Sequence, residues 1–160
     1  MSLFNRRSVM LAPLAVAACG FTPVYGPGGT GTKLQNNVLV AAPENRDSFL
    51  LVRRIEERLG RSSAPAFDLS LSLETREEGL GIDSDGNTDR FNLIGVAGYA
   101  LSNSTGDVVT SGTVNSFTGY SATGNTTVTL AAERDARERL MVILADQIVA
   151  RLLSASLPTS

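Results

Sequence analysis

The sequence predicts an α+β domain, a two-layer sandwich in which about four strands form a mixed or antiparallel sheet with two helices packed on one face. Three segments between residues 67 and 122 place apolar and polar residues alternately, which is the period of a strand. Two segments, 45–59 and 127–155, repeat apolar residues at helical spacing. The resulting order, strand, helix, strand, strand, strand, helix, is typical of helices packed over one sheet.

The first strand and the first helix are predicted between residues 38 and 59. Residues 38–41 are a short apolar run that precedes a proline. Asn45 or Asp47 can cap the helix that follows, and Gly60 stands just past its end. The apolar residues of this helix recur three and four positions apart, at Leu51, Val52, Ile55 and Leu59.

Three further strands are predicted, at residues 67–74, 91–101 and 108 to about 122. The first alternates leucine with serine and acidic residues, which indicates one buried and one wet face. A polar loop is expected between the first two of these strands. The turn cluster Asn103–Asp107 separates the other two, so we expect them to form an antiparallel hairpin.

The last helix is predicted from about Thr127 to Ala155. Opposite charges four residues apart mark its first half. Its second half is apolar around much of its circumference, so it needs burial on more than one side. Either this half packs across the sheet and against the first helix, or part of it meets a partner protein.

The N-terminus resembles the signal of a bacterial lipoprotein precursor. Arg6 and Arg7 precede an apolar run, 9–18, that is too short to span a bilayer, and the only cysteine follows it. We expect cleavage between Ala18 and Cys19 and a covalent lipid on Cys19, with no other cofactor. An ordinary secretory signal is the alternative, and export through the Sec or the twin-arginine route stays open.

The predicted domains are therefore a signal peptide at 1–18, an acylated cysteine with a flexible Gly- and Pro-rich tether at 19–37, and one domain at 38–157. Removing Arg6 and Arg7 with the signal leaves 12 basic against 16 acidic residues, a charge that argues against nucleic-acid binding. The absence of histidine and of a second cysteine excludes histidine triads, histidine-ligated zinc and thiol catalysis. We predict no catalytic residue and no metal ligand.

An acidic loop, Glu77–Asp89, is the candidate for a different function, a periplasmic module that binds calcium or a small ligand. An EF-hand loop has glycine at position six and glutamate at position twelve. Counted from Asp83, glycine is fourth and position twelve is Ile94, so the loop does not match this pattern. Arg76 and Arg90 flank this loop. Their guanidinium groups either grip lipid phosphates or pair with the neighbouring carboxylates.

Four segments carry a resemblance to a known family over nearly the whole chain. They are the start of the mature chain, the entry to the third strand, the end of the fourth strand and the opening of the last helix, at residues 19–26, 85–93, 116–121 and 131–140. In order and spacing they resemble the alphaproteobacterial branch of the LptE family of lipopolysaccharide-assembly lipoproteins.

The resemblance implies a non-enzymatic outer-membrane lipoprotein, anchored by lipid on the periplasmic face. It implies a plug and assembly factor for the LptD β-barrel in lipopolysaccharide transport. We expect Arg76, Arg90 and Tyr120 as candidate contacts with lipopolysaccharide or with the partner. The negative charge of the mature chain puts direct lipopolysaccharide binding in doubt.

Overall fold

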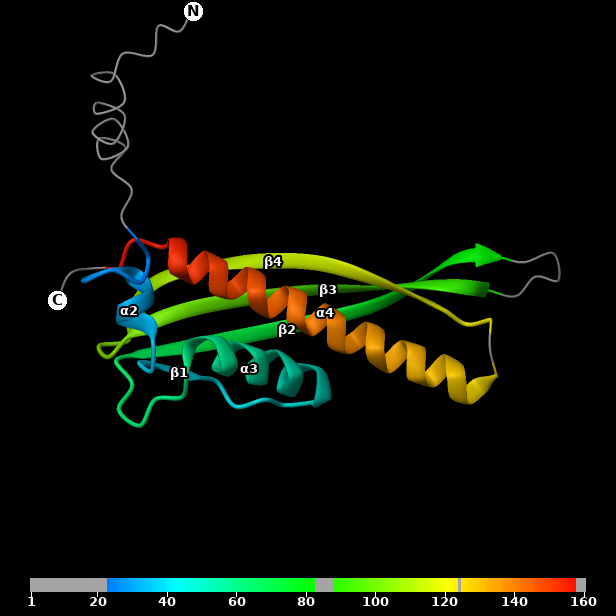
Figure 1. Ribbon diagram of the computed structural model, residues 1–160, viewed down its shortest axis with the longest axis horizontal. Coiled ribbons are helices and arrows are strands. Elements are labelled where there is room, and N and C mark those ends of the chain that lie inside the picture. Colours follow the sequence, from blue (N-terminus) through cyan, green and yellow to red (C-terminus); the bar gives the residue numbers. More distant parts are fainter. Residues whose placement is uncertain (1–22, 83–87, 124, 158–160) are drawn as a thin grey trace, which may run out of the picture.

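A computed structural model shows a two-layer α+β sandwich, as the sequence predicts. It describes residues 23–82, 88–123 and 125–157. A four-stranded mixed sheet has the order β1-β2-β3-β4, and its longer helices, α3 and α4, lie on the same face (Figure 1). The strands are β1 (Val38–Val40), β2 (Phe67–Ile82), β3 (Thr88–Asn103) and β4 (Val108–Ser121), and the helices are α2 (Thr30–Leu34), α3 (Arg46–Leu59) and α4 (Thr126–Ser154).

Helix α3 begins and ends where its sequence indicates. The Asn45 side chain accepts a hydrogen bond from the backbone N–H of Ser48, and the Ser48 hydroxyl accepts one from the N–H of Asn45. This reciprocal pair satisfies two N–H groups that the first turn leaves unbonded. At the other end, the N–H of Gly60 bonds to the carbonyl of Glu56, and Gly60 has a φ of +78°, which favours glycine.

Strands β2 and β3 form a hairpin much longer than predicted. Strand β2 was expected to end near Glu74, yet it continues to Ile82, paired with β3 from Phe67↔Asn103 to Ile82↔Thr88. Most of the expected polar loop is therefore strand, because ladder hydrogen bonds to β3 satisfy its backbone whatever its side chains. A register shift near Gly79 and Gly81 is a bulge close to the end of the hairpin.

Residues 30–37 are part of the folded domain, which differs from the expected flexible tether over 19–37. Helix α2 places Leu34 in the core, fully buried. The Thr30 hydroxyl donates a hydrogen bond to the Ala155 carbonyl at the end of α4, 3.1 Å away. The composition of this segment is that of a linker, but one leucine that docks against α4 outweighs it.

The core lies between the sheet and the helices. It is built from leucines of β2, alternate residues of β3 and one face of each long helix. Its largest fully buried side chains are Leu34, Leu51, Ile55, Leu69, Leu93, Leu101, Leu140, Met141, Leu144, Ile148, Val149 and Leu152. Helix α4 is thus buried against both the sheet and α3, which agrees with packing inside the domain as the account of its broad apolar surface.

Candidate functional site

The predicted N-terminal site residues, Ala18 and Cys19, lie outside the described residues. The described chain starts at Pro23, at the α2 end of the molecule, and the β2–β3 hairpin ends at the opposite end (Figure 1). Within the residues that the structure describes, no helix has the length and hydropathy that crossing a bilayer requires.

The other three predicted contact residues do not form one site. Arg76 is opposite Ile94, and Arg90 lies four residues from Ile94 on the same side of β3, about 13 Å away along the strand. Both arginines are on the face of the sheet that the helices leave uncovered. Arg76 is largely exposed and pairs with Glu78 at 3.3 Å, as the ion-pair alternative predicted.

Tyr120 lies on the opposite face, toward the helices. Its ring stacks on Phe91 with the centroids 5.3 Å apart. Partial burial and then a hydrogen bond with Glu77 raise the pKa of Tyr120 to about 12, because both disfavour a charged phenolate. Tyr120 therefore acts as a neutral packing and hydrogen-bonding group between β2, β3 and β4.

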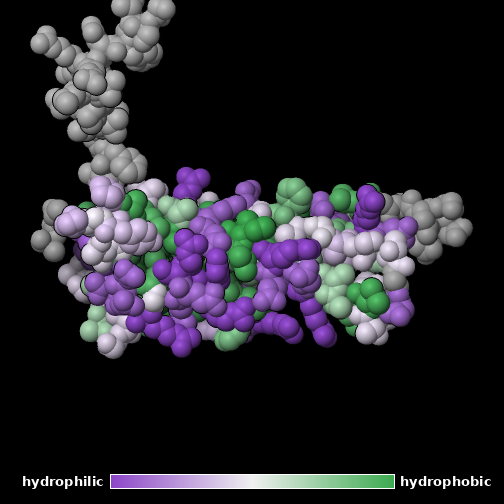
Figure 2. Space-filling model, viewed as in Figure 1, coloured by the Kyte–Doolittle hydropathy of each residue, from purple (hydrophilic) through white to green (hydrophobic). Residues whose placement is uncertain are grey.

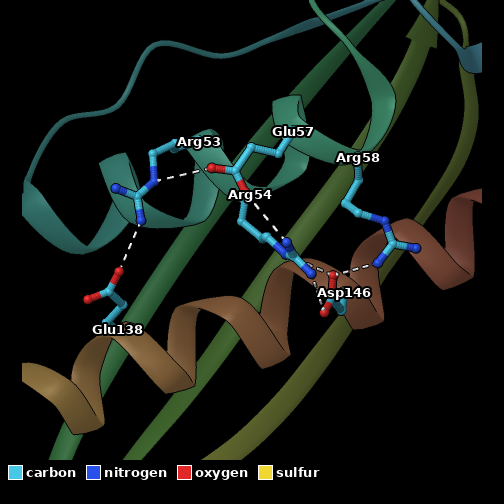
Figure 3. Close-up of polar contacts among 6 residues, drawn as sticks. All are labelled: Arg53, Arg54, Glu57, Arg58, Glu138 and Asp146. Atoms are coloured by element: carbon cyan, nitrogen blue, oxygen red, sulfur yellow. Dashed lines mark hydrogen bonds and ion pairs between the residues drawn. The ribbon is translucent and has the colours of Figure 1, made fainter.

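Helices α3 and α4 are joined by an ion-pair cluster on the outer surface of the helical layer (Figure 3). Arg54 reaches both carboxylate oxygens of Asp146, at 3.1 and 3.2 Å, and Arg58 contacts the same carboxylate at 3.0 Å. Arg53 bonds to Glu138 at 3.1 Å. These contacts fix the two helices to each other, so this cluster is structural.

Hydrophilic side chains gather over α3 and the middle of α4 on this side of the molecule (Figure 2). The described part of the chain contains no group of three residues placed to hold a metal ion. Asp83 and Asp85, which the calcium hypothesis needs, lie outside the described residues.

The uncovered face of the sheet has two zones. Small residues line its middle and leave a shallow hollow of about 430 Å³, at Ser70, Ser72, Gly98, Ala100, Ser111 and Thr113 among others. Further along, an apolar patch surrounds Phe117, which is 65% exposed and opposite Ile94, with Val96 nearby at 38% exposed. Because exposed apolar side chains gather here on one face, this patch is a candidate interaction surface.

A second hollow, of about 460 Å³, lies on this apolar patch and is lined by Asn92, Ile94, Asn115, Ser116 and Phe117. Sequence reasoning missed the patch. The signal for it was available in the alternation of β3 and β4, which places Ile94 and Phe117 on the face away from the core.

Solved structures with this fold include several lipoproteins. A candidate lipoprotein from Caulobacter crescentus CB15 superposes with a TM-score of 0.67 at 23% identity, over 79% of this chain and 95% of that chain. Rare lipoprotein B from Shewanella oneidensis gives 0.58 at 14% identity, over 75% and 94%. A minor lipoprotein from Acinetobacter baumannii gives 0.58 at 14% identity, over 79% and 96%. At such identities these likenesses establish the fold.

No curated relative matches the sequence. The family model for LptE, described as lipopolysaccharide-assembly, matches residues 35–152. This range starts one residue after Leu34 and includes the described residues of all four strands and of α3, and most of α4. The chain belongs to the LptE family of lipopolysaccharide-assembly lipoproteins.

Proposed function

We propose that this protein is a lipid-anchored, non-enzymatic plug and assembly factor that partners an LptD-type β-barrel in lipopolysaccharide transport. The observation that carries the proposal is the family match over residues 35–152, which includes most of the packed core of the domain. Its proposed location is the periplasmic face of the outer membrane.

The surface of the domain supports a role in binding a protein. One face of the sheet is covered by α3 and α4, whereas the other exposes small polar residues beside the apolar patch at Phe117. A partner can therefore contact the sheet directly, without any helix having to move. The apolar core between the sheet and the two helices holds α3 and α4 on the covered face, and the ion pairs of Asp146 join the two helices.

The proposed anchor would hold the domain close to the membrane. Only three residues separate Cys19 from Pro23, where the described chain begins. Four residue steps span at most about 14 Å when fully extended. A lipid on Cys19 would therefore keep the α2 end near the bilayer surface, while the β2–β3 hairpin reaches away from that end of the molecule (Figure 1).

Copurification from native membranes tests the partnership. We expect the full-length tagged chain, extracted in mild detergent, to bring down one large outer-membrane β-barrel in a fixed ratio. We also expect depletion of the chain to lower the amount of folded barrel and of surface lipopolysaccharide. A monomeric chain in the extract, together with normal barrel assembly after depletion, would refute the proposal.

Two variants separate the anchor from the acidic loop. Cys19→Ala should abolish acylation and membrane retention while the domain keeps its cooperative unfolding. The triple variant Asp83→Asn, Asp85→Asn, Asp89→Asn should keep barrel recovery and surface lipopolysaccharide at the wild-type level. Calorimetry with calcium on the wild-type protein should show no binding heat. Saturable heat that the triple variant lacks would favour the calcium-binding alternative.

Direct contact with lipopolysaccharide is a finer part of the proposal, and it concerns Arg76 and Arg90. Both are exposed on the uncovered face, where a guanidinium group can bind a phosphate bidentately. We expect Arg76→Ala combined with Arg90→Ala to weaken crosslinking to lipopolysaccharide without changing barrel recovery. Arg61→Ala is the matched control. Arg61 lies just beyond the end of α3, is exposed, and pairs with Glu56 of that helix.

A further inference from the structure

The two open edges of the sheet, along β2 and along β4, differ sharply in charge. Strand β1 pairs only with the first three residues of β2, so the outer side of β2 beyond Leu69 is an edge. That stretch carries Glu74, Arg76, Glu77 and Glu78. Strand β4, the other edge, has 14 residues without a charge or a proline. Proteins protect edge strands with such residues, and an unprotected long edge is a template for pairing with another strand.

The hydrogen-bonding groups that β4 presents can be assigned from its register. The N–H of Ala122 donates to the Asp89 carbonyl at 2.9 Å, so this pair is bonded to β3. Antiparallel pairs alternate between bonded and non-bonded, and the β3–β4 register runs without a shift from Arg90↔Ser121 to Leu101↔Thr110. The backbone N–H and C=O groups of the odd-numbered β4 residues therefore point to the open edge.

One side chain confirms this assignment and marks where the available edge stops. Arg139 of α4 donates a hydrogen bond to the Gly119 carbonyl at 3.2 Å, as an outward-pointing carbonyl allows. Among the described residues, no other hydrogen bond is made to the outward-pointing backbone groups of β4. The groups that await a partner are those of Ser111, Thr113, Asn115 and Phe117, a stretch of seven residues.

The side chains beside this stretch specify what an added strand should carry. Phe117 is 65% exposed and the hollow of about 460 Å³ lies against it, lined also by Asn115 and Ile94. A strand added to β4 would set its own side chains next to Phe117 on this face. An apolar side chain at that level would fill the hollow and bury Phe117.

We propose that Ser111–Phe117 of β4 binds an extended, uncharged segment of the partner protein as a fifth strand, with an apolar side chain seated beside Phe117. The proposal rests on the proposed function for the identity of the partner, the barrel. It names the element through which the domain contacts that partner.

A second copy of this chain fits the edge less well. Antiparallel self-pairing that uses the whole stretch sets Phe117 opposite Ser111 and Thr113 opposite Asn115. The hollow beside Phe117 would then meet only serine and stay unfilled. A shift that brings two Phe117 side chains together would engage Gly119, whose carbonyl already bonds to Arg139.

Amide hydrogen exchange on the full-length chain, extracted with its partner and read residue by residue, tests the proposal. We expect the amides of Ser111, Thr113, Asn115 and Phe117 to exchange at least about 100-fold more slowly in the complex than in the chain alone. The amides of the even-numbered β4 residues bond to β3 in both samples and are the internal reference.

Each outcome decides. Slow exchange at these four amides with the barrel present supports the proposal. Fast exchange with the barrel present overturns it and leaves the proposed function intact. Slow exchange in a dimer of this chain without barrel overturns it in favour of self-pairing. If the extracted chain brings down no barrel and these amides exchange fast, both the proposal and the proposed function are overturned.

Substitutions at Asn115 separate the backbone from the side chain. Asn115→Pro removes one outward N–H and no bond to β3, whereas Asn115→Ala keeps the N–H. We expect about tenfold less barrel to be recovered with Asn115→Pro and at most about twofold less with Asn115→Ala, because the alanine keeps the N–H and loses only a side chain that lines the hollow. Thr113→Lys adds a charge at the edge and should lower barrel recovery in the same way. It serves as the test if the proline variant fails to fold. Wild-type recovery with both Asn115→Pro and Thr113→Lys would overturn the proposal.

Discussion

The substitution Leu34→Ala tests whether the glycine-rich segment before β1 is a tether or part of the core. Leu34 is fully buried in α2, and α2 is tied to the end of α4 by the bond from Thr30 to Ala155. If the segment were a tether, removing three carbon atoms from this side chain would leave the folding equilibrium unchanged. Because the side chain is packed, its removal leaves a cavity.

The expected loss follows from this burial. Replacing a buried leucine by alanine costs about 2–5 kcal/mol. Leu34 is on a short helix at one end of the domain that can partly collapse, so we expect about 3 kcal/mol. With a urea dependence of about 2 kcal/mol per molar, the midpoint should fall by about 1.5 M. The melting temperature should fall by about 10 °C.

Urea unfolding followed by circular dichroism measures this change. Leu39→Ala is the matched control, because Leu39 lies five residues away and is 51% exposed, and it should change stability by less than about 0.5 kcal/mol. A loss below about 0.5 kcal/mol for Leu34→Ala would refute the packing of α2 and restore the tether.

Three further predictions concern the helix pair, the partly buried Tyr120 and the end of α3 at Gly60. Asp146→Ala should lower the free energy of unfolding by about 1 kcal/mol, and by less in 1 M salt, which screens the ion pairs. A double-mutant cycle with Arg54→Ala should show coupling between the two residues, and additive losses would contradict the pairing. Because the pKa of Tyr120 is raised from 10.0 to about 12 on folding, its contribution to stability is complete below pH 10 and is lost as the pH rises toward 12. Titration by ultraviolet absorbance, with Tyr120→Phe as reference, should find this late phenol, and its absence would contradict the burial. Gly60→Ala should cost at least about 1 kcal/mol in thermal unfolding, since φ is +78° and the new Cβ would collide with the Asn36 side chain; an unchanged melting temperature would refute this.

Local patterns predicted the type of most elements. The helical spacing of α3 and α4 and the alternation in β2, β3 and β4 depend on residues close together in the chain, and each of these elements is present. A cap at Asn45 or Asp47 and a stop at Gly60 were also predicted, and the structure has Asn45 as the cap. The fold class followed from the order of these elements.

The length of the β2–β3 hairpin and the start of the folded domain were not predicted from the sequence. Residues 75–82 are polar and acidic, and they are strand because the distant β3 supplies their hydrogen bonds. Helix α2 has five residues in a glycine-rich segment, too few for a recognisable period, and the burial of Leu34 depends on α4. In both places a long-range contact outweighs local preference.

The candidate site divides in the same way. The sequence by itself determined the lipoprotein-like N-terminus, the exclusion of histidine and thiol chemistry, and the family resemblance, because these depend on which residues are present and in what order. Only the tertiary structure decided that Arg76 and Arg90 lie on the uncovered face and Tyr120 on the other. It also decided that β4 is an edge strand and that its Phe117 is exposed. Faces and edges are set by strand register and by which strand has no neighbour, and neither is a property of any one segment.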